Sequence, residues 1–283
     1  MKRKTTSLIV LLFLCTGLLA QSSKNNIIKN LEFQKALGFE MLPVDLLSSQ
    51  PSITLENIKV EKEVSQAEFL SLNTSTFSKL KNSPIELIEI TIPSQTHGDI
   101  NLELYKTKIV SDDFKVFVAS DRQNPYAYNL GTFYWGSVKG DDESIASISI
   151  SSTGVSGFIH SKGETFVLGK LENEDNTYIL YRERDLLIQN TVGCDVDDSK
   201  HLITKKIESA VRIEDPNNCV KMYIEVDNDI FNNKGTVQAT TDYITDVFAQ
   251  VAILYANESI NFAVNEIVVW DVTDPYTGPS TSN

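Results

Sequence analysis

The chain has 283 residues, with 25 Lys and Arg against 38 Asp and Glu, so its formal net charge is −13 at pH 7. Nucleic acid and anionic membrane surfaces are poor partners for so acidic a protein, because they carry charge of the same sign. The length suits two modest domains or one large one.

Residues 1–20 have the pattern of a secretory signal peptide. Residues 2–4 are Lys-Arg-Lys, the apolar run 8–19 follows, and Ala20 is a suitable cleavage position before a polar stretch. The apolar run is too short to span a bilayer, and no later segment is apolar for long enough. We therefore expect a secreted, extracellular protein without a membrane anchor, whose net charge falls from −13 to −16 when the three basic residues are removed.

Residues 21–190 predict a β-rich domain. The polar start at 21–50 favours a short helix or an extended arm, and apolar and polar residues then alternate with the period of a half-buried strand. Strand candidates, separated by turn-forming Gly, Asp and Asn, lie at 85–91, 100–105, 114–118, 132–135, 145–151, 154–160, 165–171 and 177–182. Many short strands with close turns indicate an antiparallel sandwich or open barrel.

The composition changes toward the C-terminus. Residues 191–218 are polar and charged, which is typical of a linker, and helical periodicity follows, with a start expected at Gly235-Thr236. Strand-like runs begin at Cys219 and Ile260, so the order is β–α–β, which predicts a right-handed crossover and parallel strands. One helix stripe holds the mostly apolar positions Thr240, Ile244, Val247, Phe248, Val251, Leu254 and Tyr255. We expect this face to stay partly exposed, because only the two strands and the β domain are present to cover it.

Two stretches carry more specific patterns. The first is Tyr134-Trp-Gly-Ser-Val-Lys-Gly-Asp-Asp-Glu-Ser-Ile-Ala-Ser-Ile-Ser-Ile150, followed by Gly154-Val-Ser-Gly-Phe-Ile-His160. The second, within 219–276, contains the runs Y-I-E-V-D-N-D-I-F, A-I-L-Y-A-N-E-S-I and I-V-V-W. The first resembles the propeptide of the reprolysin-like (adamalysin-type) zinc metalloproteases, which are metzincins. The second resembles the first strand, first helix and second strand of their catalytic domain.

The resemblance implies the zymogen of an exported zinc endopeptidase that acts on proteins or peptides. The fold would be α+β: an antiparallel β-rich propeptide domain at 21–190, the linker, and at 219–283 the truncated N-terminal part of an α/β catalytic domain. In that family the histidines of a His-Glu-x-x-His helix hold zinc, and the glutamate acts as general base on a metal-bound water.

The zinc motif is not among the 283 residues. His97, His160 and His201 stand in unrelated contexts with no pair at i and i+4, so each is interpreted as an ordinary strand or surface histidine. We therefore expect no catalytic residue, no zinc and no activity in this part of the protein, with the zinc site of the full-length enzyme beyond Asn283.

Cys194 and Cys219 are the cysteines that remain after signal cleavage, and they leave two alternatives open. By the resemblance, Cys194 is a candidate inhibitory zinc ligand, a cysteine switch that keeps the enzyme latent. Alternatively, the two cysteines form a disulfide, which pairing arithmetic favours in an oxidising compartment. Lys205-Lys206 is a candidate processing site. Cleavage there would not release the propeptide if the cysteines were bridged, so the switch alternative favours unbridged cysteines.

Other patterns give weaker signals. Ser156 and His160 invite comparison with a catalytic triad, but no Gly-x-Ser-x-Gly turn supports one. Asp227 and Asp229 fail the calcium-loop pattern and are interpreted as turn residues.

The alternative function is an exported, non-enzymatic β-sandwich for adhesion or ligand binding. Surface aromatic residues would line its binding face, although aromatic residues in strands more often belong to a core. The candidates are Tyr126, Tyr128, Phe133, Tyr134 and Trp135.

Overall fold

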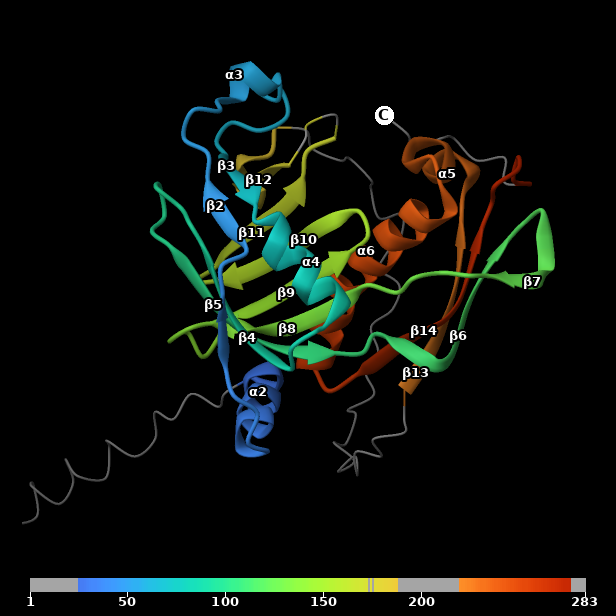
Figure 1. The fold of residues 1–283 in the computed structure, drawn as a ribbon, viewed down its shortest axis with the longest axis horizontal. Coiled ribbons are helices and arrows are strands. Elements are labelled where there is room, and N and C mark those ends of the chain that lie inside the picture. Colours follow the sequence, from blue (N-terminus) through green and yellow to red (C-terminus); the bar gives the residue numbers. More distant parts are fainter. Residues whose placement is uncertain (1–24, 173, 175, 188–218, 276–283) are drawn as a thin grey trace, which may run out of the picture.

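The computed structural model describes residues 25–172, 174, 176–187 and 219–275, and it shows a strand-rich α+β chain with two sheets (Figure 1). Several predictions concern residues outside this range and are not tested by it. They are the signal peptide at 1–20 and the linker at 191–218, which includes Cys194, His201, Lys205 and Lys206.

The larger sheet has ten strands in the order β1-β4-β5-β8-β9-β10-β11-β12-β3-β2. All neighbours are antiparallel except β1 and β4. The bounds are β1 Leu42–Val44, β2 Leu47–Ser49, β3 Glu68–Leu72, β4 Leu87–Ile92, β5 Ile100–Thr107, β8 Thr132–Val138, β9 Ile145–Ser151, β10 Gly154–Ser161, β11 Glu164–Lys170 and β12 Thr177–Arg182.

The two edges of this sheet must lie close together. Only Asp45 and Leu46 separate β1 from β2, although these strands form opposite edges. Because an extended residue spans at most about 3.6 Å, the sheet has to curl until its edges approach each other. The curl encloses a first core, built mainly from Leu and Ile side chains with Tyr134 and Tyr178, and helix α4 (Thr74–Asn82) adds Leu80 to it.

The smaller sheet joins segments that are far apart in the sequence. Its order is β13-β14-β6-β7, with bounds Cys219–Val226, Asn261–Val269, Val110–Val118 and Asp121–Tyr126. β13 and β14 are parallel, so the predicted parallel pair is confirmed. β14 also pairs in parallel with β6, and the β6–β7 hairpin comes from the region assigned by sequence to the β domain. The two regions therefore share one sheet.

Helix α6 (Val237–Asn257) lies between the two sheets (Figure 1), and it contacts β14 on one side and β8, β9 and β10 on the other. It begins at the start expected from the sequence. The Thr236 side chain caps it by accepting a hydrogen bond from the Ala239 amide. α2 (Asn26–Ala36) also packs on α6, and together they enclose a second core that contains Ile27, Trp135 and Ile253.

Three short helices complete the described fold. α5 (Asn228–Lys234) precedes α6, so the interpretation of Asp229 as a turn residue was wrong: it lies in the first turn of a helix that the αL residue Gly235 ends. Asp227 stands at the N-cap position of that helix. α3 (Leu55–Ile58) and the 3₁₀ turn η2 (Glu183–Asp185) lie beside β3 and β12. None of the helices in the described ranges is long and apolar enough to cross a membrane.

Candidate functional site

The face of α6 that turns toward the large sheet is polar and buried. Asp242 has no exposed surface and Asp246 keeps 8% of its surface exposed, and Thr241 and Thr245 lie beside them with none exposed. The two carboxylates stand one helical turn apart, so they project from the same face. A helix that buries two acids against a sheet is unusual, because a buried charge costs free energy unless partners stabilise it.

Four hydrogen-bond donors surround Asp242. The Tyr128 hydroxyl donates to Oδ1 at 2.8 Å and Gln238 Nε2 donates to the same oxygen at 2.9 Å. The Ser152 backbone amide donates to Oδ2 at 3.1 Å, and its hydroxyl donates to that oxygen as well. Ser152 belongs to the turn between β9 and β10, so Asp242 ties α6 to that turn.

Asp246 has fewer donors. The hydroxyls of Ser156 and Ser151 donate to Oδ2 at 3.1 and 3.3 Å, while Oδ1 is buried with no hydrogen-bond partner among the described residues. Burial and the negative charge of Asp242 raise the pKa of Asp246 to about 7, and the serine hydroxyls only partly oppose this shift. Asp246 is therefore a carboxyl group that titrates near neutral pH.

The same carboxylates shift the pKa of Tyr128. Burial and the charge of Asp242 raise the pKa of its hydroxyl well above the ordinary tyrosine value, so it remains a neutral donor to Asp242. Tyr128 follows β7 in the chain and also packs edge-on against Phe114 of β6. We call the contact formed by Tyr128, Ser151, Ser152, Ser156, Asp242 and Asp246 the α6 seam.

A cleft of about 810 Å³ opens beside the α6 seam. Its walls come from the β9–β10 turn, the end of β11 with the residues after it, and the helices α5 and α6. Asp246 lines it together with Ser156 and Lys170. Lys234 at its rim bonds Glu172 at 2.7 Å and lies 4.7 Å from the centre of the Tyr243 ring. The volume is in the range of small-molecule sites.

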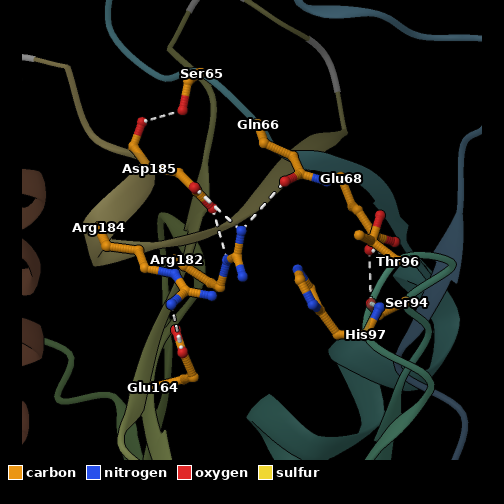
Figure 2. A network of polar contacts seen from close by, with 10 residues as sticks. All are labelled: Ser65, Gln66, Glu68, Ser94, Thr96, His97, Glu164, Arg182, Arg184 and Asp185. Carbon is orange, nitrogen blue, oxygen red and sulfur yellow. Dashed lines mark hydrogen bonds and ion pairs between the residues drawn. The ribbon is translucent and has the colours of Figure 1, made fainter.

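A second polar network, shown in Figure 2, closes the other end of the large sheet. The Glu68 carboxylate accepts hydrogen bonds from the Ser94 hydroxyl at 2.6 Å and from the Gln95 and Thr96 amides at 2.7 and 3.0 Å. Partial burial raises the pKa of Glu68, but these hydrogen bonds outweigh it and hold the pKa below its ordinary value.

The remaining contacts of that network fasten η2 to its neighbours. Arg182 contacts both oxygens of Asp185, at 2.7 and 3.1 Å, and Arg184 forms an ion pair with Glu164 at 2.8 Å (Figure 2). The cavity between these groups measures about 10 Å³, which holds no more than one water molecule. We therefore assign this network a structural role and the α6 seam, with its open cleft, the role of candidate site.

The residues singled out from sequence are dispersed in the fold. His97 packs its ring edge-on against Phe166 with the ring centres 5.3 Å apart, and the ring of His160 hydrogen-bonds Thr165 at 3.0 Å. Ser156 hydrogen-bonds an acid, Asp246. Among the described residues no histidine hydrogen-bonds either of them, so they do not form a triad. Cys219 forms no disulfide with another described residue, and its disulfide with Cys194 stays a prediction.

The aromatic residues near β8 belong mainly to the interior. Phe133, Tyr134 and Trp135 are buried, Tyr128 lies in the α6 seam, and Tyr126 is exposed. They do not form one aromatic face on the surface.

Within the described ranges no group of three or more His, Cys, Asp or Glu side chains is placed to hold a metal ion. Cys194, the candidate inhibitory ligand, lies outside those ranges.

Sequence reasoning missed Asp242 and Asp246 because it followed the apolar stripe of the helix. A signal was nevertheless present. Thr and Asp repeat at 240–242 and 245–246, and β9 alternates Ser147, Ser149 and Ser151 on the face opposite Ile148 and Ile150. Small polar residues on a helix and on a strand of the same chain indicate a polar contact between them.

No protein-family model matches the chain, and no curated protein matches it. The function therefore has to be inferred from sequence patterns and geometry.

Proposed function

We propose that the chain is the N-terminal part of an exported zinc metalloendopeptidase zymogen that acts on proteins or peptides. Residues 21–190 act as the propeptide and the segment from Cys219 begins the catalytic domain. Zinc would be bound by residues beyond Asn283, and Cys194 remains the candidate ligand that keeps the enzyme latent.

The positions of the motif residues support this proposal. The propeptide-like motif forms β8, β9 and β10, the strands of the large sheet on which α6 rests. The catalytic-like motif forms β13, α6 and β14, a parallel β–α–β unit. The two motif regions are thus packed directly against each other, as a propeptide and the domain that it holds would be.

The observation that carries the proposal is the incomplete cover of the β13–α6–β14 unit. Among the described strands β13 pairs with β14 alone, so its outer edge is open. Tyr243, Val247, Val251 and Leu254 form a stripe on α6, and each is between 42% and 47% exposed. Parallel sheets are normally covered on both faces, and large exposed apolar stripes mark contact surfaces. More strands and helices of a catalytic domain would cover both features.

An exported, non-enzymatic binding module is the alternative. The aromatic binding face on which it rested is mostly core, since Phe133, Tyr134 and Trp135 are buried. The cleft beside Asp246 is the place where such a module would take a ligand.

The test is to read the coding sequence past codon 283 and to express the product with that extension. We expect an in-frame His-Glu-x-x-His, one bound zinc per chain, and peptidase activity after propeptide removal that chelators abolish. The matched control replaces the glutamate of that motif by glutamine, which should retain zinc and lose activity. A stop codon directly after Asn283, or an extended product with no zinc-dependent peptidase activity, would overturn the proposal and favour the binding module.

A further inference from the structure

The α6 seam joins the two motif-bearing regions of the chain through polar groups. Asp242 and Asp246 come from the catalytic-like helix, and their serine partners come from β9, β10 and the turn between them. Three further buried hydroxyls on the same helix and strand, those of Thr241, Ser147 and Ser149, have no hydrogen-bond partner among the described residues. Such an incompletely satisfied contact is weakly held, because unpaired buried polar groups cost free energy.

The protonation state of Asp246 determines how favourable the contact between α6 and the large sheet is. Asp242 and Asp246 face the same serine-lined surface, and one oxygen of Asp246 is enclosed without a donor. A carboxylate there would place a second negative charge beside Asp242 in a buried environment, whereas a neutral carboxyl group avoids that repulsion.

We propose that the α6 seam is proton-dependent: a protonated Asp246 holds α6 on β9 and β10, and release of that proton to water loosens the contact. The raised pKa of Asp246, about 7, agrees with this geometry.

The sign of the pH dependence follows from linkage. The pKa of Asp246 rises from an ordinary value of 3.8 to about 7 in the folded chain, so the folded state binds more protons than the open state between these values. The stability of the seam is therefore greatest at acid pH and falls as the pH rises toward 7. The equilibrium constant for opening should rise by up to about tenfold per pH unit in this window and level off above it.

The other ionisable groups near Asp246 are paired with each other, line the cleft opening or lie further along the strands. Across the cleft, Lys234 is already paired with Glu172, while Lys170, Glu172 and Glu174 line the opening. His160 lies further along β10 and hydrogen-bonds Thr165. β9 offers serines, Tyr128 donates to Asp242, and β8, β14 and α2 meet α6 mainly through the apolar second core.

The chain contains its own reporter of this contact. It has two tryptophans, and the indole of Trp135 on β8 donates a hydrogen bond to the backbone oxygen of Ala249 on α6 at 3.2 Å. Trp135 keeps 8% of its surface exposed, so separation of α6 from β8 should shift its emission to the red. Trp270→Phe removes the second indole and leaves Trp135 as the single probe.

The experiment follows Trp135 emission in urea titrations of the Trp270→Phe chain at pH 5, 6, 7 and 8. We expect the opening constant in water to rise about tenfold from pH 5 to 6 and about fivefold from pH 6 to 7. Adding Asp246→Asn, which keeps the shape and removes the titrating group, should flatten this dependence. Adding Asp142→Asn, which removes an exposed acid in the β8–β9 turn, should leave it unchanged.

Two results would overturn the proposal. One is an opening constant in the Trp270→Phe chain that does not change between pH 5 and 7. This result can be obtained even if the Asp246→Asn variant does not fold. The other is a pH dependence that survives in Asp246→Asn. In the zymogen proposed above, the seam would let propeptide release become easier toward neutral pH, a consequence that rests on the proposed function. The fluorescence test involves no zinc and no peptidase, so its failure and that of the protease proposal are distinguishable.

Discussion

Two carboxyl groups of this chain have pKa values shifted in opposite directions. Glu68 is only partly buried and accepts two backbone amide hydrogen bonds and one from a serine, so its pKa falls. Asp246 is almost fully buried, lies beside Asp242 and accepts hydroxyl donors at one oxygen, so its pKa rises. The number of hydrogen-bond donors and the depth of burial therefore set the direction of each pKa shift. Glu68 stays ionised and fastens a turn, whereas Asp246 can change its protonation state near neutral pH.

The glycines of the propeptide-like motif have a packing reason. A Cβ at Gly136 would lie 1.9 Å from the backbone oxygen of Glu103 on the neighbouring strand β5, and one at Gly157 would lie 2.5 Å from the Ile148 side chain. Gly140, with φ +82°, occupies a turn conformation that other residues rarely adopt. The motif can therefore be understood as a requirement for closely packed strands.

Gly136→Ala should destabilise the fold by about 2 kcal/mol or more, because backbone atoms of β5 would have to move. Gly169→Ala is the matched control. Gly169 also lies in a strand of the large sheet, but a Cβ there meets nothing within 4 Å, so the change should be neutral or stabilise by up to about 1 kcal/mol. Urea unfolding measures both. Equal losses for the two variants would show that the close approach at Gly136 is not a constraint.

At the scale of elements, the sequence predicted those whose own periodicity is strong. The expected strands at 145–151 and 177–182 agree with β9 and β12, and the expected helix start agrees with α6. β7 was missed because all six of its residues are exposed, so no apolar alternation marks it. The short β1 and β2 span three residues each, too few to establish a period.

The buried face of α6 could not be derived from the apolar stripe alone. Thr240, Ile244 and Phe248 of the stripe are buried or half-buried, whereas Val247, Val251, Leu254 and Tyr255 are 42–47% exposed, which agrees with the expected partial exposure. Which side of a helix is covered depends on the second sheet, and its position is fixed by the pairing of β6 with β14.

Val251→Glu should leave the described fold stable to within about 1 kcal/mol, because the residue is 43% exposed and the new charge can remain in water. The same substitution at Ile253, two residues further along α6 and fully buried, should prevent folding. Thermal unfolding and binding of a hydrophobic dye measure the two effects, and dye binding should fall in Val251→Glu. A strongly destabilised Val251→Glu would mean that the stripe is already covered in this chain.

At the scale of the whole molecule, the contact between the two regions could not be read from local patterns. β6 and β14 are separated by more than 140 residues, and Val116 lies opposite Ile267 in their register. Periodicity predicts that each segment is a strand, but it contains no information on which strand will be its neighbour. The α6 seam has the same origin, since its groups come from the segment after β7, from β9, β10 and the turn between them, and from α6.

This topology predicts that cutting the connecting segment will not separate the molecule. With a specific protease site inserted between Lys205 and Lys206, the cleaved chain should elute as one species at pH 6 in the presence of a reducing agent, which removes any bridge between Cys194 and Cys219. The pairing of β14 with β6 and the second core should hold the two pieces with a Kd of about 1 μM or tighter, equivalent to about 8 kcal/mol.

Val116→Asp is the variant that should release the pieces, because Val116 keeps 2% of its surface exposed and belongs to the second core. Lys115→Asp is its matched control, since the neighbouring side chain is exposed and points to the other face of β6. Size-exclusion chromatography distinguishes these results. Separation of the pieces in the otherwise unchanged chain would show that the covalent connection, and not the shared sheet, holds the two regions together. Retention in both variants would show that the α6 side of the contact suffices without β6.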